Sequence, residues 1–258
     1  MHPILNIAVR AIRKASNFLT ESYERIDVIN QPINFFMVSN MIKLARNIII
    51  DVIHQAYPDH SIYSESLQDN SDLHWIITSL DGVTNFVKKI PHFSISVALR
   101  IKNRTEISVI YDFMRNELFT AVRGQGAQLN AYRLRRSPVE RTINSMIVAT
   151  EYSSKMYQPH GDAYIKLVHK MIVQGAEIRS TGARILDLAY VAAGRMDGYF
   201  IMGVTMEEIA AGMLLICEAG GLVADFHGGH DYLKKDNFVA ASTPRNLRAL
   251  LKLLVNNS

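Results

Sequence analysis

Hydrophobic positions in the first part of the chain recur at helical spacing. They predict two amphipathic helices, over residues 4–22 and 37–57, and the second is expected to end just before Pro58. Basic residues interrupt the apolar positions of the first helix, so we expect this helix to belong to the fold and not to serve as a targeting peptide.

After Pro58 the pattern changes to that of strands. Apolar segments predict five strands, around residues 61–64, 74–78, 93–101, 105–112 and 117–122. Within the third segment small residues alternate with larger apolar ones, namely Ser94, Ser96 and Ala98 against Ile95, Val97 and Leu99. This alternation is typical of an antiparallel sheet that has one covered face.

The last part of the chain alternates strands and helices. We expect strands at 147–150, 177–180, 198–202 and 222–226, and helices at 161–174, 182–194, 206–221 and 244–257. No flexible linker separates the two parts. The sequence therefore predicts a single unit over residues 1–258, in which an α+β first half (1–142) packs closely against an α/β second half (143–258).

Composition narrows the class of protein. The 258 residues are 48% hydrophobic, which is enough for a substantial core, and 20% charged. No apolar run approaches the roughly 20 residues that a membrane-spanning helix needs, so we expect a soluble, cytoplasmic protein without membrane contact. The single cysteine, Cys217, lies in the apolar run MLLICEAG and is predicted to be a buried small side chain.

Positive charge is mild but locally concentrated. A net charge of +4 permits contact with nucleic acid or with an acidic protein without requiring it. The densest basic stretch is residues 132–141, with Arg133, Arg135, Arg136 and Arg141, and a smaller one is formed by Lys88 and Lys89. A solvated loop face and a specific contact with RNA or protein both explain the longer stretch.

Candidate chemistry rests mainly on carboxylates. Four of them stand near predicted turns or helix starts and could be brought together around Mg²⁺: Glu65, Asp81, Glu207 and Glu208. Acidic residues in a first helical turn are also explained by the helix dipole. His227 and His230 could bind a metal, but a Gly-rich surface turn explains the segment DFHGGHDY better.

Several long segments resemble the inositol monophosphatase family, and the resemblance extends over nearly the whole chain. The segments are PHFSISVALRIKNRTEISVIYD, RNELFTAVRGQGAQLN, LDLAYVAAGRMDGYF and EAGGLVADFHGGH. The resemblance implies a five-layer α-β-α-β-α sandwich, combining α+β and α/β parts. It also implies the family's activity, in which phosphate monoesters are hydrolysed with Mg²⁺ held by carboxylates.

The family's first signature, W-x-x-D-P-x-D-G-T-x-N-F, reads WIITSLDGVTNF here. Thr78 therefore stands where the bridging aspartate is expected, and Val83 stands where a threonine orients the attacking water. Ile42 falls at an acidic position of the second helix, and Ile201 at a glutamate that contacts the substrate's hydroxyl groups.

The remaining matches imply only vestigial sites and no catalytic residue. Metal ligands would come from Glu65, Leu80, Asp81 and Glu208, the last standing in place of an aspartate. Substrate contacts would come from Asp81, Gly82, Val83, Arg179 and Glu208. A neutral threonine cannot bridge two Mg²⁺ ions or offset their repulsion, so we expect Mg²⁺ binding to be weak or absent.

The resemblance leaves two functions open. Proteins of the family's bacterial branch act in ribosomal RNA transcription antitermination, together with RNA polymerase, NusA, other Nus factors and nascent ribosomal RNA. The leading hypothesis is such a factor, homodimeric and with little or no catalysis. The alternative is a Mg²⁺-dependent inositol-1-monophosphatase with a rearranged site, in which Asp112, Asp187 or Glu207 moves beside Asp81.

Overall fold

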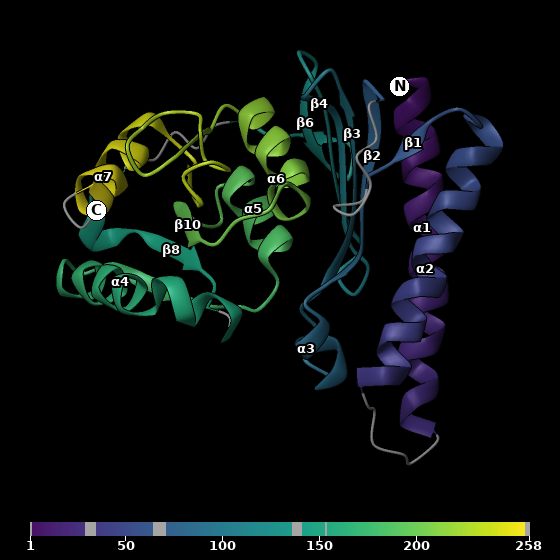
Figure 1. Ribbon diagram of the computed structural model, residues 1–258, viewed down its shortest axis with the longest axis horizontal. Coiled ribbons are helices and arrows are strands. Elements are labelled where there is room, and N and C mark those ends of the chain that lie inside the picture. Colours follow the sequence, from purple (N-terminus) through teal and green to yellow (C-terminus); the bar gives the residue numbers. More distant parts are fainter. Residues whose placement is uncertain (1, 29–34, 64–70, 136–140, 153, 256–258) are drawn as a thin grey trace.

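The computed structural model describes residues 2–28, 35–63, 71–135, 141–152 and 154–255. Its elements form five layers, and α1 (Pro3–Val28) and α2 (Phe35–Ala56) make up the first of them. A seven-stranded sheet follows, then α5 (Arg184–Ala192) and α6 (Met206–Ala219), a five-stranded sheet, and finally α4 (Ser154–Val173) and α7 (Pro244–Leu254) (Figure 1). This is the five-layer sandwich that the resemblance implied.

The first sheet is antiparallel except at one edge, where β1 runs parallel to β2. Its strands follow one another in chain order: β1 (Ser61–Ile62), β2 (Leu73–Asp81), β3 (Ser94–Ile101), β4 (Arg104–Asp112), β5 (Glu117–Val122), β6 (Gly126–Leu129) and β7 (Tyr132–Arg133). The first five lie within two residues of their predicted positions at most boundaries. The two short strands β6 and β7 were not predicted.

Both faces of this sheet are covered, so the expectation of one exposed face was wrong. The large residues of β3 pack with α1 and α2, while Ser94, Ser96 and Ala98 on the other face are also buried. Small side chains on that face let α6 approach closely, and the buried Ser108 hydroxyl donates a hydrogen bond of 2.8 Å to the carbonyl oxygen of Ala211. The polar positions thus mark the face of the sheet that contacts a helix, and not a face exposed to solvent.

The middle layer is closely packed. A Cβ at Gly212 of α6 would lie 2.4 Å from the Cβ of Leu188 on α5, so only glycine allows this approach. Cys217, which was predicted to be buried, is instead exposed. It stands beside Glu218, whose carboxylate accepts hydrogen bonds from the backbone of Gly124 and Gly126.

The second sheet is mixed and has the order β11-β12-β10-β8-β9. Its strands are β8 (Ile147–Thr150), β9 (Glu177–Arg179), β10 (Gly198–Met202), β11 (Leu222–Ala224) and β12 (Asn237–Ala241). The sequence did not predict β12, which pairs antiparallel with both of its neighbours. No helix in the described part of the chain is long and apolar enough to cross a membrane.

Candidate functional site

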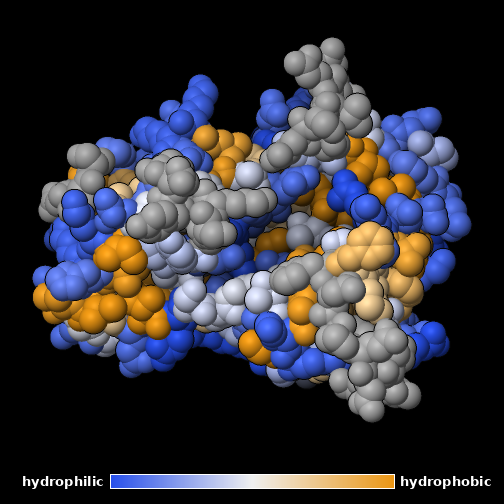
Figure 2. All heavy atoms as spheres, turned by 60° about the horizontal axis from the view of Figure 1, so that its bottom comes forward, coloured by the Kyte–Doolittle hydropathy of each residue, from blue (hydrophilic) through white to orange (hydrophobic). Residues whose placement is uncertain are grey.

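A pocket of about 340 Å³ opens where both halves of the chain meet. It lies at the end of β2, the start of the short helix α3 (Val83–Val87), the end of β8 and the N-termini of α5 and α6. Figure 2 shows the molecule from this side, with a hollow between the two halves. The lining residues are Thr78, Leu80, Asp81, Gly82, Val83, Thr84, Glu151, Gly182, Arg184, Ile185, Glu207 and Glu208.

An irregular strand end positions the first-signature residues. The register between β2 and β3 shifts between Thr78 and Asp81, which turns the chain out of the sheet. Gly82 then adopts a φ of 83°, and a Cβ at this position would lie 2.9 Å from the carbonyl oxygen of His92. Asn85 fixes the turn, because its amide donates hydrogen bonds of 2.8 Å to the carbonyl oxygens of His92 and Thr181.

Asp81 caps α5. Its Oδ2 accepts hydrogen bonds from the backbone nitrogens of Ile185, at 2.9 Å, and Leu186, at 3.3 Å. These N–H groups have no partner inside the helix, and the helix dipole favours a negative charge at this end. Burial and the nearby Glu151 carboxylate nevertheless raise the pKa of Asp81 to about 7. The carboxylate predicted to bind metal therefore already has a structural role.

Arg184 places a positive charge in the pocket. It begins α5, and its side chain is only 9% exposed. Its Nε donates a hydrogen bond of 2.8 Å to Oε2 of Glu151, and its Nη1 forms an ion pair with Oε1 of Glu208. Burial disfavours the charge of Arg184, but the nearby Tyr199 side chain and these two carboxylates raise its pKa above the usual value. The guanidinium is thus held between two acidic residues.

Both oxygens of Glu208 are engaged. Oε1 pairs with Arg184, and Oε2 accepts a hydrogen bond of 2.9 Å from the backbone nitrogen of Thr205. The second contact belongs to a capping box at the start of α6, in which the Thr205 side chain also accepts from the backbone of Glu208. Glu208 therefore stabilises a helix start and a buried arginine.

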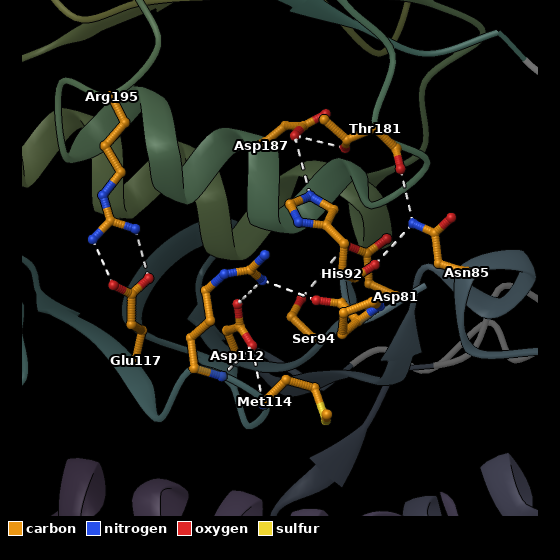
Figure 3. Close-up of polar contacts among 12 residues, drawn as sticks. Asp81, Asn85, His92, Ser94, Asp112, Met114, Glu117, Thr181, Asp187 and Arg195 are labelled. Carbon is orange, nitrogen blue, oxygen red and sulfur yellow. Dashed lines mark hydrogen bonds and ion pairs between the residues drawn. The ribbon is translucent and has the colours of Figure 1, made fainter. Parts of the chain in front are cut away.

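Two of the three carboxylates that could have rebuilt a metal site, Asp112 and Asp187, are held by other partners outside the pocket lining. Asp187 accepts a hydrogen bond of 2.7 Å from the Thr181 hydroxyl and lies 3.8 Å from His92, as Figure 3 shows. Asp112 binds the Arg115 guanidinium at 2.9 Å and caps the turn that follows β4 (Figure 3). Glu207 does line the pocket, where its carbonyl oxygen lies 3.5 Å from the Thr78 hydroxyl.

Other predicted site residues lie apart from the pocket. Arg179 is exposed, pairs with Glu177 at 2.6 Å and is not among the lining residues of this pocket, so its contact with a substrate stays a prediction. Ile42 is partly buried against the core that α1 and α2 share with the first sheet, and Ile201 is fully buried in β10. Glu65 lies outside the described residues.

The predicted basic residues are only partly placed. Arg133, Arg135 and Arg141 are exposed, and Arg136 lies outside the described residues. Lys89 is not a free surface charge, because its ammonium group donates to the carbonyl oxygen of Tyr23 and lies 3.8 Å from the centre of that ring.

The described residues do not fit the Mg²⁺ ions that the family uses. Mg²⁺ needs near-octahedral oxygen ligands, several of them charged when two ions lie close together. Here Asp81 caps a helix, each Glu208 oxygen already has a partner, Thr78 is neutral and the Arg184 guanidinium lies among them. Within the described ranges no group of three or more metal-binding side chains is positioned to hold an ion.

Sequence reasoning missed Arg184 and Glu151. One signal was available for Arg184, since a basic residue in the first turn of a helix opposes the helix dipole and calls for an acidic partner. Glu151 gave no such signal, because it follows a buried strand and becomes meaningful only when the strand end meets α5.

Comparison with known proteins shows the wider relationship. The model of the inositol monophosphatase family matches residues 1–258. Nus factor SuhB of Escherichia coli K12 is 49% identical, over 97% of this chain and 95% of the relative, and Nus factor SuhB of Vibrio cholerae is 44% identical over 100% and 97%.

Solved structures agree with this relationship. The extragenic suppressor protein suhB of Bartonella henselae superposes with a TM-score of 0.86 at 32% identity, covering 98% of both chains. The inositol monophosphatase of Anabaena superposes with a TM-score of 0.86 at 26% identity, covering 99% of this chain and 96% of the other. This chain belongs to the inositol monophosphatase family.

Proposed function

We propose that this protein is a Nus factor of the SuhB type, part of a ribosomal RNA transcription antitermination complex in the cytoplasm. In that complex it would join RNA polymerase, NusA, other Nus factors and nascent ribosomal RNA, as a homodimer. The observation that carries the proposal is the 49% identity to a Nus factor SuhB over nearly the full length of both chains.

The pocket supports the second part of the proposal, which is that phosphatase activity is lost or very weak. Efficient hydrolysis needs a positioned water and metal charge at the phosphate. Val83 cannot orient a water, and Thr78 cannot bridge metals. Three carboxylates of the pocket, Asp81, Glu151 and Glu208, already accept hydrogen bonds from backbone N–H groups or from Arg184.

The alternative function, a Mg²⁺-dependent inositol-1-monophosphatase, would require a rearranged ligand set. Asp112 and Asp187 would have to leave the partners that they hold here, Arg115 and Thr181. Glu207 is the only one of the three that lines the pocket. This favours the binding role over the enzyme.

A basic groove offers a surface for the nascent RNA. It has a volume of about 420 Å³ and is lined by Arg141, Arg245, Arg248 and Lys252, together with apolar residues such as Ile143. The three α7 residues are exposed and lie at spacings of three and four, so they share one helix face about 10 Å long. Arg141 is anchored by Asp197 at 3.3 Å. Phosphate groups of a single strand are the partner that such a cationic rim suits.

The catalytic part is tested by Mg²⁺-dependent hydrolysis of inositol-1-phosphate with purified protein. We expect negligible turnover by the wild type. A variant that carries Thr78→Asp, Val83→Thr, Glu208→Asp and Ile42→Asp should recover some activity. A wild-type kcat on the order of 10 s⁻¹, typical of ordinary enzymes, would show that the site works and would favour the alternative.

A further inference from the structure

We propose that the Arg184 guanidinium is the resident cation of the pocket, which takes the place of divalent metal ions and excludes them. The inference rests on the proposed loss of phosphatase activity, and it names the residue that keeps metal ions out of the pocket.

The first argument is the competition for ligands. Arg184 begins α5, Glu151 follows β8 and Glu208 lies in the first turn of α6, so three segments place one positive and two negative charges together. Carboxylate oxygens are the ligands that a hard divalent cation requires. Two of the four oxygens already bind the guanidinium, and a third accepts from the backbone of Thr205.

The second argument is the permanence of the charge. A guanidinium is not deprotonated in proteins, so it cannot make room for a metal by losing its proton, as a lysine or histidine can. Its planar shape also suits contacts to two carboxylates at once. A metal ion entering this pocket would therefore meet both a fixed positive charge and two carboxylates of whose four oxygens three already have partners.

The third argument is the position itself. A cation in the first turn of α5 is disfavoured by the helix dipole, and a nearly buried charge is costly unless it is paired. Glu151 and Glu208 offset both effects. Removing Arg184 would leave two unpaired carboxylates beside Asp81, which is an acidic cavity of the kind that attracts divalent cations.

The test is binding of Mn²⁺, a substitute for Mg²⁺, measured by isothermal titration calorimetry and by the loss of the free Mn²⁺ electron paramagnetic resonance signal. Arg184→Met, which keeps an unbranched apolar stem but removes the charged guanidinium, should bind Mn²⁺ at least tenfold more tightly than wild type. Arg184→Lys keeps a cation, but one that can lose its proton and that lacks the planar guanidinium, so its Mn²⁺ affinity should lie between those of wild type and Arg184→Met.

Arg195→Met is the matched control for removing a paired arginine. Arg195 forms two contacts of 2.6 Å with Glu117, outside the pocket, so its loss should leave Mn²⁺ binding unchanged. If Arg184→Met does not fold, the double variant Arg184→Met Glu151→Gln carries less unpaired charge and should still bind more tightly than wild type.

Equal Mn²⁺ affinity of wild type and the folded Arg184 variant would overturn the inference, as would a gain at Arg195→Met of the same size. A wild type that binds Mn²⁺ tightly without hydrolysing phosphate esters contradicts this inference alone. A wild type that hydrolyses them contradicts the proposed loss of catalysis, so the two failures can be told apart.

Discussion

At the scale of single residues, Asp225 shows how one buried carboxylate organises a loop. Its side chain is fully buried and accepts hydrogen bonds from the backbone of His227 and Gly229, at 2.8 and 3.0 Å, and from Lys235 at 2.9 Å. The segment with His227 and His230 is thus the Gly-rich turn that the sequence favoured. Burial alone would raise the pKa of Asp225, but these contacts outweigh it and lower the pKa to about 2.

Asp225→Asn should lower the free energy of unfolding at pH 7 by about 2 kcal/mol, since a pKa shift of this size is linked to stability. The folded pKa lies below the ordinary value of 3.8, so the stabilisation is present above pH 4 and is lost as the pH falls toward 2. Urea unfolding of both proteins at pH 7, 4 and 2.5 checks this. If the difference in the free energy of unfolding between wild type and Asp225→Asn does not shrink as the pH is lowered, this prediction is wrong.

Residue identities at the pocket were predictable only where a motif supplied them. Thr78, Leu80, Asp81, Gly82, Val83 and Glu208 all line it, as expected from the family signatures. The motif gave no information on what these residues bind. Asp81 caps α5 and Glu208 pairs with Arg184 because three distant segments of the chain meet at the pocket. The periodicity of the sequence does not reveal where such segments meet.

At the scale of elements, long apolar patterns predicted helices and strands well, whereas short or covered elements were missed. The five residues of β12 follow a charged turn and offer too little alternation to identify a strand. Helix α4 begins at Ser154, earlier than the predicted start at residue 161. The alternating serines of β3 suggested that one face of the sheet is exposed to solvent. In the structure these small side chains are buried and allow a layer of helices to pack on that face.

Gly212→Ala tests the contact between α5 and α6. The new methyl group would overlap Leu188, and overpacking of this kind costs about 1–3 kcal/mol. We expect the free energy of unfolding to fall by about that amount in thermal and urea denaturation. Cys217→Ala, on the exposed side of the same helix, is the control and should change stability little. Equal stability of Gly212→Ala and wild type would show that the helices are not tightly packed.

At the scale of the whole molecule, the fold is that of a phosphatase family, while the pocket between its halves is lined by ion pairs within the chain itself. The five layers could be anticipated because the family segments span nearly the whole chain. The basic groove could not, since Arg141 and the α7 residues are more than 100 positions apart in sequence. Of the four basic residues that line this groove, only Arg141 belongs to the basic stretch 132–141 that the sequence indicated.

The most direct measurement of the central claim is assembly with RNA polymerase, NusA, the other Nus factors and ribosomal leader RNA, over a range of salt concentrations. The double variant Arg245→Glu Arg248→Glu should weaken assembly. It should also reduce the slope of the logarithm of affinity against the logarithm of salt concentration by about 1–2, since each lost phosphate contact contributes about 0.7.

The double variant Arg10→Glu Lys43→Glu, at exposed positions of α1 and α2, is the charge-matched control and should assemble as wild type. The pocket variant Asp81→Asn should also assemble normally. Loss of assembly in Asp81→Asn, with none in the groove variant, would contradict the account.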